Sequence, residues 1–153
     1  MKVLNYIFGL FNKAADEASS SSSMKHVHIP DVPASFSGKS IAQKMLFSYG
    51  LYSVRIETSN EELSDGYNQT DNVVVLSLST YFNESVIAVA TACHEVGHAV
   101  AYLSGFQGTP LQNEQKATSI ALEFLKNELS QEQYNTASAF LHACMETYIS
   151  FDI

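Results

Sequence analysis

The chain has 153 residues, 46% hydrophobic and 16% charged, which is typical of one globular domain with its own core. A chain of this length can fold stably without disulfides or a structural metal. Any metal ligands in it therefore indicate a metal that serves the function of the protein. The formal net charge of -8 and the pI near 4.9 argue against a nucleic-acid partner and against attraction to anionic lipid.

Residues 1–35 are predicted to form an appendage to the main domain at 36–153. Its first part, 3–15, is expected to be a short amphipathic helix that either packs on the body or lies at a membrane interface, and packing is preferred. A serine-rich linker follows. His26 and His28 alternate as in a strand and could bind a metal, although histidines in such a linker usually face water.

The middle of the chain predicts one helix and two strands. Apolar residues recur every three to four positions over 38–49, as in a helix, and Gly50 stands where a helix cap is expected. Alternating apolar and polar residues predict a half-buried strand at 52–58. A polar loop at 59–72 leads to a second strand at 73–77, which is either the sheet edge on which an extended peptide lies or an interior strand.

Three helices are predicted in the remainder. The longest spans 84–103 and is stopped by glycines, and a second begins at Pro110. Ser130 and Gln133 resemble the capping box of a last helix. Together the elements predict an α+β domain that is mostly helical, with a small sheet beside the longest helix.

No stretch has the pattern of a membrane span or a signal peptide. The apolar stretch at 3–11 is about half the length needed to cross a bilayer. The stretch at 85–102 is long enough but carries ionisable side chains, so it is interpreted as a buried helix. The start lacks the order of a signal peptide. The protein is therefore expected to be cytoplasmic, or peripherally membrane-associated through residues 3–11, and not secreted.

The sequence HEVGH at residues 94–98 is an HExxH motif within the longest predicted helix. His94 and His98 are four residues apart, so they project from one face and can bind the same metal ion. Glu95 lies about 100° round the helix, a position suited to taking a proton from water on that ion. Zinc with an open coordination position would polarise a substrate carbonyl, so the motif predicts a hydrolytic zinc site.

The residues around the motif indicate a metal site and not a chance occurrence of the HExxH pattern. An HExxH sequence would arise at random in such a chain roughly once in a hundred cases. The alternative, two surface histidines on a helix, predicts polar flanks. Instead the flanks are uncharged, as a buried active-site helix requires: Thr91, Ala92, Cys93, Val96, Gly97, Ala99 and Val100.

The third ligand is sought by geometry. Ala101 and Ser104 exclude the long HExxHxxGxxH motif. If the helix after Pro110 runs antiparallel to the motif helix, Glu114 lies about 5 Å past the turn and is level with the histidines. Glu128 lies about 26 Å along. Glu114 is therefore the predicted ligand, and the alternative is a first-turn acid that complements the helix dipole.

Asn113 and the two cysteines are not predicted to take a direct part in catalysis. Asn113 either supports the metal site or simply begins the helix. Cys93 and Cys144 lack the sequence context of nucleophiles and are interpreted as small, reduced core residues rather than a disulfide.

Four segments resemble, in order and spacing, the YugP-like neutral zinc metallopeptidases: FSGKSIAQKMLFSYGL, LSDGYNQTDNVVVLS, ESVIAVATACHEVGHAV and NEQKATSIALEFL. The resemblance covers about residues 36–150. It implies a zincin-like fold, a zinc cofactor and hydrolysis of peptide or protein substrates. It also implies that His94, His98 and Glu114 are the zinc ligands and that Glu95 is the base.

The chain departs from this family in two places. Members typically carry membrane-spanning segments at their ends, which this chain does not show. The loop that commonly reads like DHYDP in the family is DGYNQ here, at residues 65–69. Tyr67 remains, and it either hydrogen-bonds an oxyanion near the metal or packs beside a strand.

The sequence thus predicts a zinc-dependent endopeptidase. Two alternatives stay open. One is a noncatalytic metal-binding or inhibitory module that keeps the motif helix, and the other is a zinc hydrolase that acts on a non-peptide amide.

Overall fold

The computed structural model of the protein describes residues 29–61 and 64–151. The predicted helix at 3–15, most of the linker, His26 and His28 lie outside the described residues. The described part is a mixture of helices and one small sheet, which confirms the predicted α+β class. Its elements are α2 (Gly38–Ser48), β1 (Arg55–Ser59), β2 (Gly66–Asn68), β3 (Val73–Ser77), α3 (Leu78–Phe82), α4 (Val86–Leu103), α5 (Pro110–Leu125) and α6 (Gln131–Phe151).

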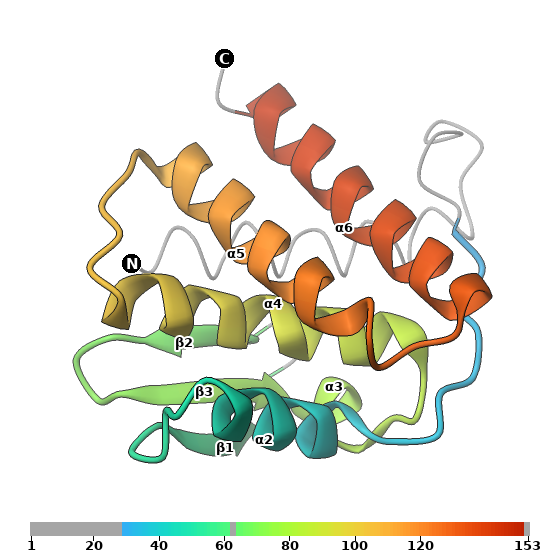
Figure 1. The fold of residues 1–153 in the computed structure, drawn as a ribbon, viewed down its shortest axis with the longest axis horizontal. Coiled ribbons are helices and arrows are strands. Elements are labelled where there is room, and N and C mark those ends of the chain that lie inside the picture. Colours follow the sequence, from blue (N-terminus) through green and yellow to red (C-terminus); the bar gives the residue numbers. More distant parts are fainter. Residues whose placement is uncertain (1–28, 62–63, 152–153) are drawn as a thin grey trace.

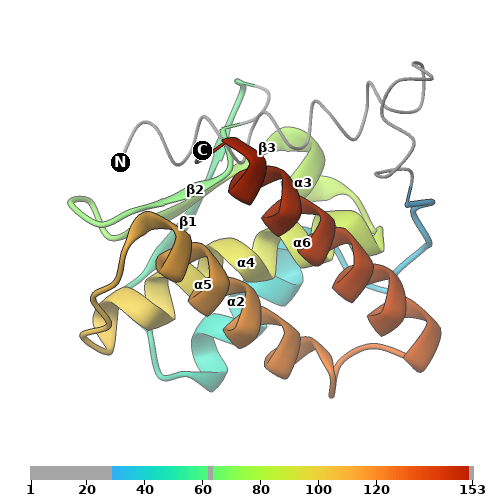
Figure 2. The same ribbon diagram turned by 90° about the horizontal axis from the view of Figure 1, so that it is seen from above.

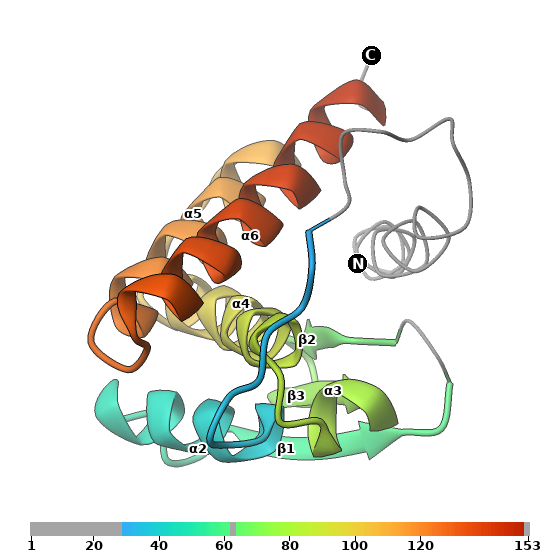
Figure 3. The same cartoon turned by 90° about the vertical axis from the view of Figure 1, so that its right-hand side faces the viewer.

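Helix α4 lies at the centre of the fold, between two layers. The sheet with α2 and α3 packs on one side of α4, and α5 with α6 packs on the other (Figure 1 and Figure 3). An 18-residue window of α4 is long and apolar enough to cross a membrane, but 72% of it is buried inside the protein. This burial confirms the interpretation of 85–102 as a buried helix.

The sheet has the strand order β1-β3-β2. Strand β3 pairs in parallel with β1 and antiparallel with β2, so it is the central strand. The interior interpretation of 73–77 is therefore confirmed, and the edge interpretation was wrong. Residues on both faces of β3 are buried, which explains its unbroken apolar run. The edge beside α4 is formed by the short strand β2.

The connection from α4 to α5 reverses the chain. Gly105 adopts the left-handed conformation, with φ +86°, just after α4 ends. Thr109 and Gln112 then form a capping box, and Pro110 occupies the first turn of α5. Helix α5 consequently runs back across α4, as Figure 2 shows from above, and the predicted reversal is confirmed.

Most predicted elements agree with the structure, and the disagreements are local. The strand predicted at 52–58 begins only at Arg55, because Leu51 and Val54 form a turn through the bond from the Val54 amide to the Leu51 carbonyl. Strand β2 and helix α3 were not predicted. The capping box of Ser130 and Gln133 is present, with both reciprocal hydrogen bonds formed.

The segment just before α2 is attached to the start of α4. Pro33 forms a bridge with Ser85, and the Asp31 carboxylate accepts a hydrogen bond of 3.0 Å from the Ile87 amide. These contacts fix the N-terminal end of α4 on the body of the domain.

Candidate metal centre

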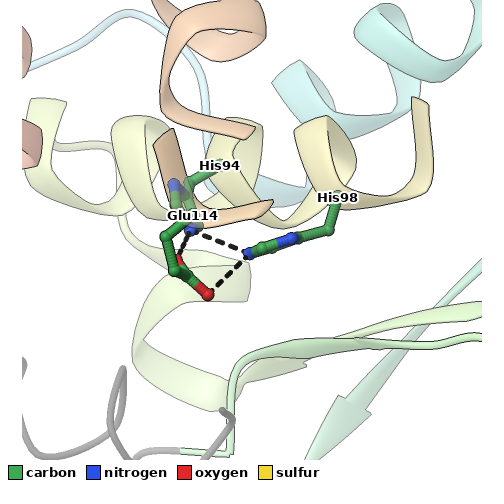
Figure 4. A group of neighbouring side chains, drawn as sticks. All are labelled: His94, His98 and Glu114. Atoms are coloured by element: carbon green, nitrogen blue, oxygen red, sulfur yellow. Dashed lines mark hydrogen bonds and ion pairs between the residues drawn. The ribbon is translucent and has the colours of Figure 1, made fainter. Parts of the chain in front are cut away.

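Two turns of α4 and the second turn of α5 bring three side chains together. His94 Nε2 lies 2.8 Å from Glu114 Oε2, and His98 Nε2 lies 3.2 Å from Glu114 Oε1. The two imidazole Nε2 atoms are 3.1 Å apart. Figure 4 shows that all three side chains point toward one another. The three residues predicted as ligands therefore converge on one point.

The centre is buried. His94 is 1% exposed and Glu114 4%, while His98 is partly exposed. Glu114 thus points into the core, whereas a simple first-turn acid would point to solvent. A carboxylate at this depth needs a compensating cation or proton.

A second contact orients His94. The Thr118 hydroxyl, one turn beyond Glu114 on α5, lies 3.1 Å from His94 Nδ1. When Nδ1 donates this hydrogen bond, Nε2 presents its lone pair to the other two residues. Metal-binding histidines usually have such a partner on the far nitrogen, because it fixes both the tautomer and the ring plane. Thr118 was not singled out in the sequence, where nothing distinguishes it from other helical threonines.

The electrostatics of the cluster follow from burial and proximity. Burial by itself raises the pKa of Glu114, but His94 and His98 outweigh it and hold that pKa well below the usual range. Burial lowers the pKa of His94, and Glu114 opposes this effect. The preferred state is thus an ionised carboxylate facing imidazole nitrogens, which is a donor set for a cation.

The donor set fits zinc. Around a tetrahedral zinc ion with bonds of about 2.1 Å, neighbouring ligand atoms lie roughly 3.4 Å apart. Here one ligand atom from each of the three residues lies within 4.8 Å of the other two. Two imidazoles and one carboxylate are also a ligand combination of catalytic zinc sites that leaves the fourth position open.

Glu95 follows His94 in α4 and is 2% exposed. Burial raises its pKa well above the usual value, and the charges of Glu114 and Asp65 raise it further. Since the Glu114 charge acts on Glu95, the HExxH glutamate shares the electrostatic environment of the cluster. Glu95 is therefore a buried carboxyl group and not a surface charge.

Asp65 is a buried acid, 1% exposed, to which the sequence pattern gave no role. Its carboxylate accepts hydrogen bonds from the Ser77 amide at 2.8 Å and from the Ser77 hydroxyl. Burial raises its pKa and these hydrogen bonds oppose the rise. Asp65 thereby joins the start of β2 to the start of α3. In the sequence it precedes a glycine in a polar stretch, a pattern that indicates only a turn.

Tyr67 does not join the cluster through its hydroxyl. The hydroxyl donates a hydrogen bond of 2.7 Å to Asn72 Oδ1, and the ring lies 6.1 Å from the Tyr102 ring, between centroids. These contacts favour the packing alternative.

The two cysteines are free and buried, as expected for core residues. Burial, followed by the charge of Glu114, raises the pKa of Cys144 to about 12. Burial likewise raises the pKa of Cys93. Neither thiol is therefore a ready nucleophile at neutral pH.

We expect Thr118→Val to lower zinc affinity roughly 10- to 100-fold, because the variant keeps the side-chain volume and loses the hydroxyl that orients His94. Competition with a chromophoric chelator measures the affinity. Thr91→Val is the matched control, since that buried hydroxyl donates its hydrogen bond to the Ile87 carbonyl within α4 and not to a histidine of the centre. Equal affinities for the two variants would contradict the orienting role.

Comparisons with known proteins point to one family. The family model described as "Putative neutral zinc metallopeptidase" matches residues 4–114. The chain is also similar to the "Putative membrane protease YugP" of Bacillus subtilis (strain 168). The two are 36% identical over 76 residues, which cover 50% of this chain and 34% of that protein. No solved structure matches the chain.

The family match covers well over half of the chain, including all of α4 and the start of α5. The chain is related to only about a third of the length of the Bacillus protein. The matched region includes His94, Glu95, His98 and Glu114. On this match, the chain belongs to the family of neutral zinc metallopeptidases.

Proposed function

We propose that the protein is a zinc-dependent endopeptidase with a zincin-like fold, in which His94, His98 and Glu114 bind zinc and Glu95 is the general base. The observation that carries the proposal is the buried convergence of two imidazoles and a carboxylate within 4.8 Å, next to the glutamate of an HExxH motif. Membership of the metallopeptidase family supports the same chemistry.

In the proposed mechanism the residues of the centre have separate roles. A zinc ion bound at this centre supplies a Lewis acid that polarises a carbonyl and lowers the pKa of water. Glu95, once ionised, accepts a proton from the attacking water at its carboxylate and donates it to the leaving amine. Thr118 holds His94 in the required orientation.

The proposed substrate is a peptide or protein segment in extended conformation. Among the described strands, β2 is the edge strand next to α4, on the opposite side of the sheet from β1. Pairing with this edge would bring a substrate backbone close to the motif helix without selecting its side chains.

The direct test is hydrolysis of a broad peptide library by the purified chain. We expect cleavage that stops with a chelator and returns when zinc is restored. Zinc binding without any cleavage would favour the noncatalytic module. Cleavage of small amides but not of peptides would favour the hydrolase of non-peptide amides.

The oxyanion role of Tyr67 is tested separately. Because its hydroxyl is bonded to Asn72, we expect Tyr67→Phe to change kcat less than about threefold and to lower the free energy of unfolding by about 1 kcal/mol. Steady-state kinetics and urea unfolding measure the two effects. A loss of kcat of roughly 10²- to 10³-fold would instead establish the oxyanion role.

We further propose that residues 1–35 are an appendage to the catalytic domain at 36–153, and that the domain works in the cytoplasm or at a membrane surface contacted by residues 3–11. The similarity to a protein named as a membrane protease supports a membrane-associated location. Sedimentation with neutral lipid vesicles, with and without residues 1–28, measures this contact.

A further inference from the structure

Helices α4 and α5 approach each other very closely at one point. A methyl group built on Gly97 would lie 2.4 Å from the carbonyl oxygen of Ala117 and 3.1 Å from its carbonyl carbon. Both are backbone atoms, so no rotation of a side chain could relieve the contact. Gly97 is in the interior of α4, where glycine is less favourable than alanine. The close crossing explains why this position has no side chain.

The contact between Gly97 of α4 and Ala117 of α5 lies among the residues of the candidate metal centre. Gly97 stands between His94 and His98 in the chain, one residue before His98. Ala117 stands between Glu114 and Thr118 on α5. The two contacts that α5 makes with His94, at 2.8 Å from Glu114 and 3.1 Å from Thr118, therefore flank the Gly97–Ala117 contact.

A side chain at position 97 would displace these contacts. To reach even 3.0 Å from the new methyl group, the Ala117 oxygen would have to retreat by roughly 0.6 Å. Metal–ligand distances tolerate deviations of only about 0.2 Å. The displacement of α5 would thus pull Glu114 and Thr118 away from the histidines.

We propose that Gly97 is a positioning residue of the metal centre: the absence of a side chain at Gly97 sets the spacing between α4 and α5 at which Glu114 reaches the same ion as His94 and His98. The inference rests on the proposed zinc site. Gly97 itself touches neither the ion nor the substrate, and it acts through Glu114.

A double-mutant cycle on zinc affinity tests the proposal. We expect Gly97→Ala to lower zinc affinity roughly 10- to 100-fold in the chain with Glu114. In the Glu114→Ala background the same change should lower zinc affinity by a clearly smaller factor, because the ligand that it displaces is already gone and only the contact of Thr118 with His94 is left to disturb. The d–d spectrum of the cobalt-substituted protein gives a second readout of how many protein ligands remain.

Gly38→Ala is the matched control. A methyl group there would lie 2.0 Å from the Thr80 carbonyl oxygen, an even tighter backbone contact, but between α2 and α3. We expect it to reduce the melting temperature and to leave zinc affinity within about threefold. If Gly97→Ala does not fold, Ala117→Val is the second variant, because Ala117 is fully buried and its Cα lies 3.1 Å from a methyl group built on Gly97, so a larger side chain there has to displace α5 from its neighbours. Its predicted effects on the cycle are the same.

The outcomes distinguish a failure of the proposed zinc site from a failure of the positioning role of Gly97. If the wild-type chain binds no zinc, the proposed function fails. If it binds zinc but Gly97→Ala keeps full affinity, or loses equal affinity with and without Glu114, the positioning role of Gly97 is overturned while the zinc site stands.

Discussion

Replacing Glu95 by glutamine is expected to lower kcat for peptide hydrolysis by roughly 10²- to 10⁴-fold while the chain still binds one zinc ion. The amide has nearly the shape of the carboxylate but cannot accept the proton of the attacking water. The three ligand side chains are unchanged, so metal content should be unaffected. Single-turnover kinetics with a cleaved peptide, together with zinc analysis of the same sample, measure both quantities.

Glu84→Gln provides the control for this experiment. Glu84 is an exposed acid just before α4, and its replacement changes the net charge by the same amount without touching the centre. It should retain the activity of the wild-type chain. Full activity in Glu95→Gln would reject Glu95 as the base, whereas loss of both activity and zinc would mean that Glu95 has a structural role.

Replacing Glu114 by alanine is expected to reduce zinc affinity more than 100-fold, because the loss of a direct ligand exceeds the 10- to 100-fold effect typical of an outer partner. Two histidines alone hold zinc weakly. Glu114 also carries the charge that balances the ion, at a position only 4% exposed. Isothermal titration with zinc measures the change.

Glu128→Ala is the control, since Glu128 was the competing acid on the same stretch of chain. Its carboxylate forms an ion pair of 2.6 Å with Lys44, whose side chain is 62% exposed. Such a pair contributes about 1 kcal/mol or less to stability. Zinc affinity should therefore stay at the wild-type value. The reverse pattern, with zinc lost in Glu128→Ala and retained in Glu114→Ala, would refute the ligand assignment.

The arrangement of the centre could be inferred from the sequence because it depends on helical geometry. Four-residue spacing places His94 and His98 on one face, and the glycines and proline between the helices predict a reversal. From these two features the rise per residue is enough to select Glu114 over Glu128. The structure brings together these same three residues.

Other features depend on contacts between distant segments, and the local pattern could not reveal them. Strand β2 has three residues, too few for an alternating pattern, and it exists because β3 offers it a partner. The burial of Asp65 depends on the amide of Ser77, twelve residues away. The contact between Gly97 and Ala117 likewise appears only when the two helices are packed.

The proposed function depends on His94, His98 and Glu114 holding one zinc ion. The most direct measurement is an anomalous-difference map from crystals of the full chain grown with zinc, with data recorded on both sides of the zinc absorption edge. We expect one peak about 2 Å from His94 Nε2, His98 Nε2 and a Glu114 carboxylate oxygen. Three separated side chains, or no peak at saturating zinc, would contradict it.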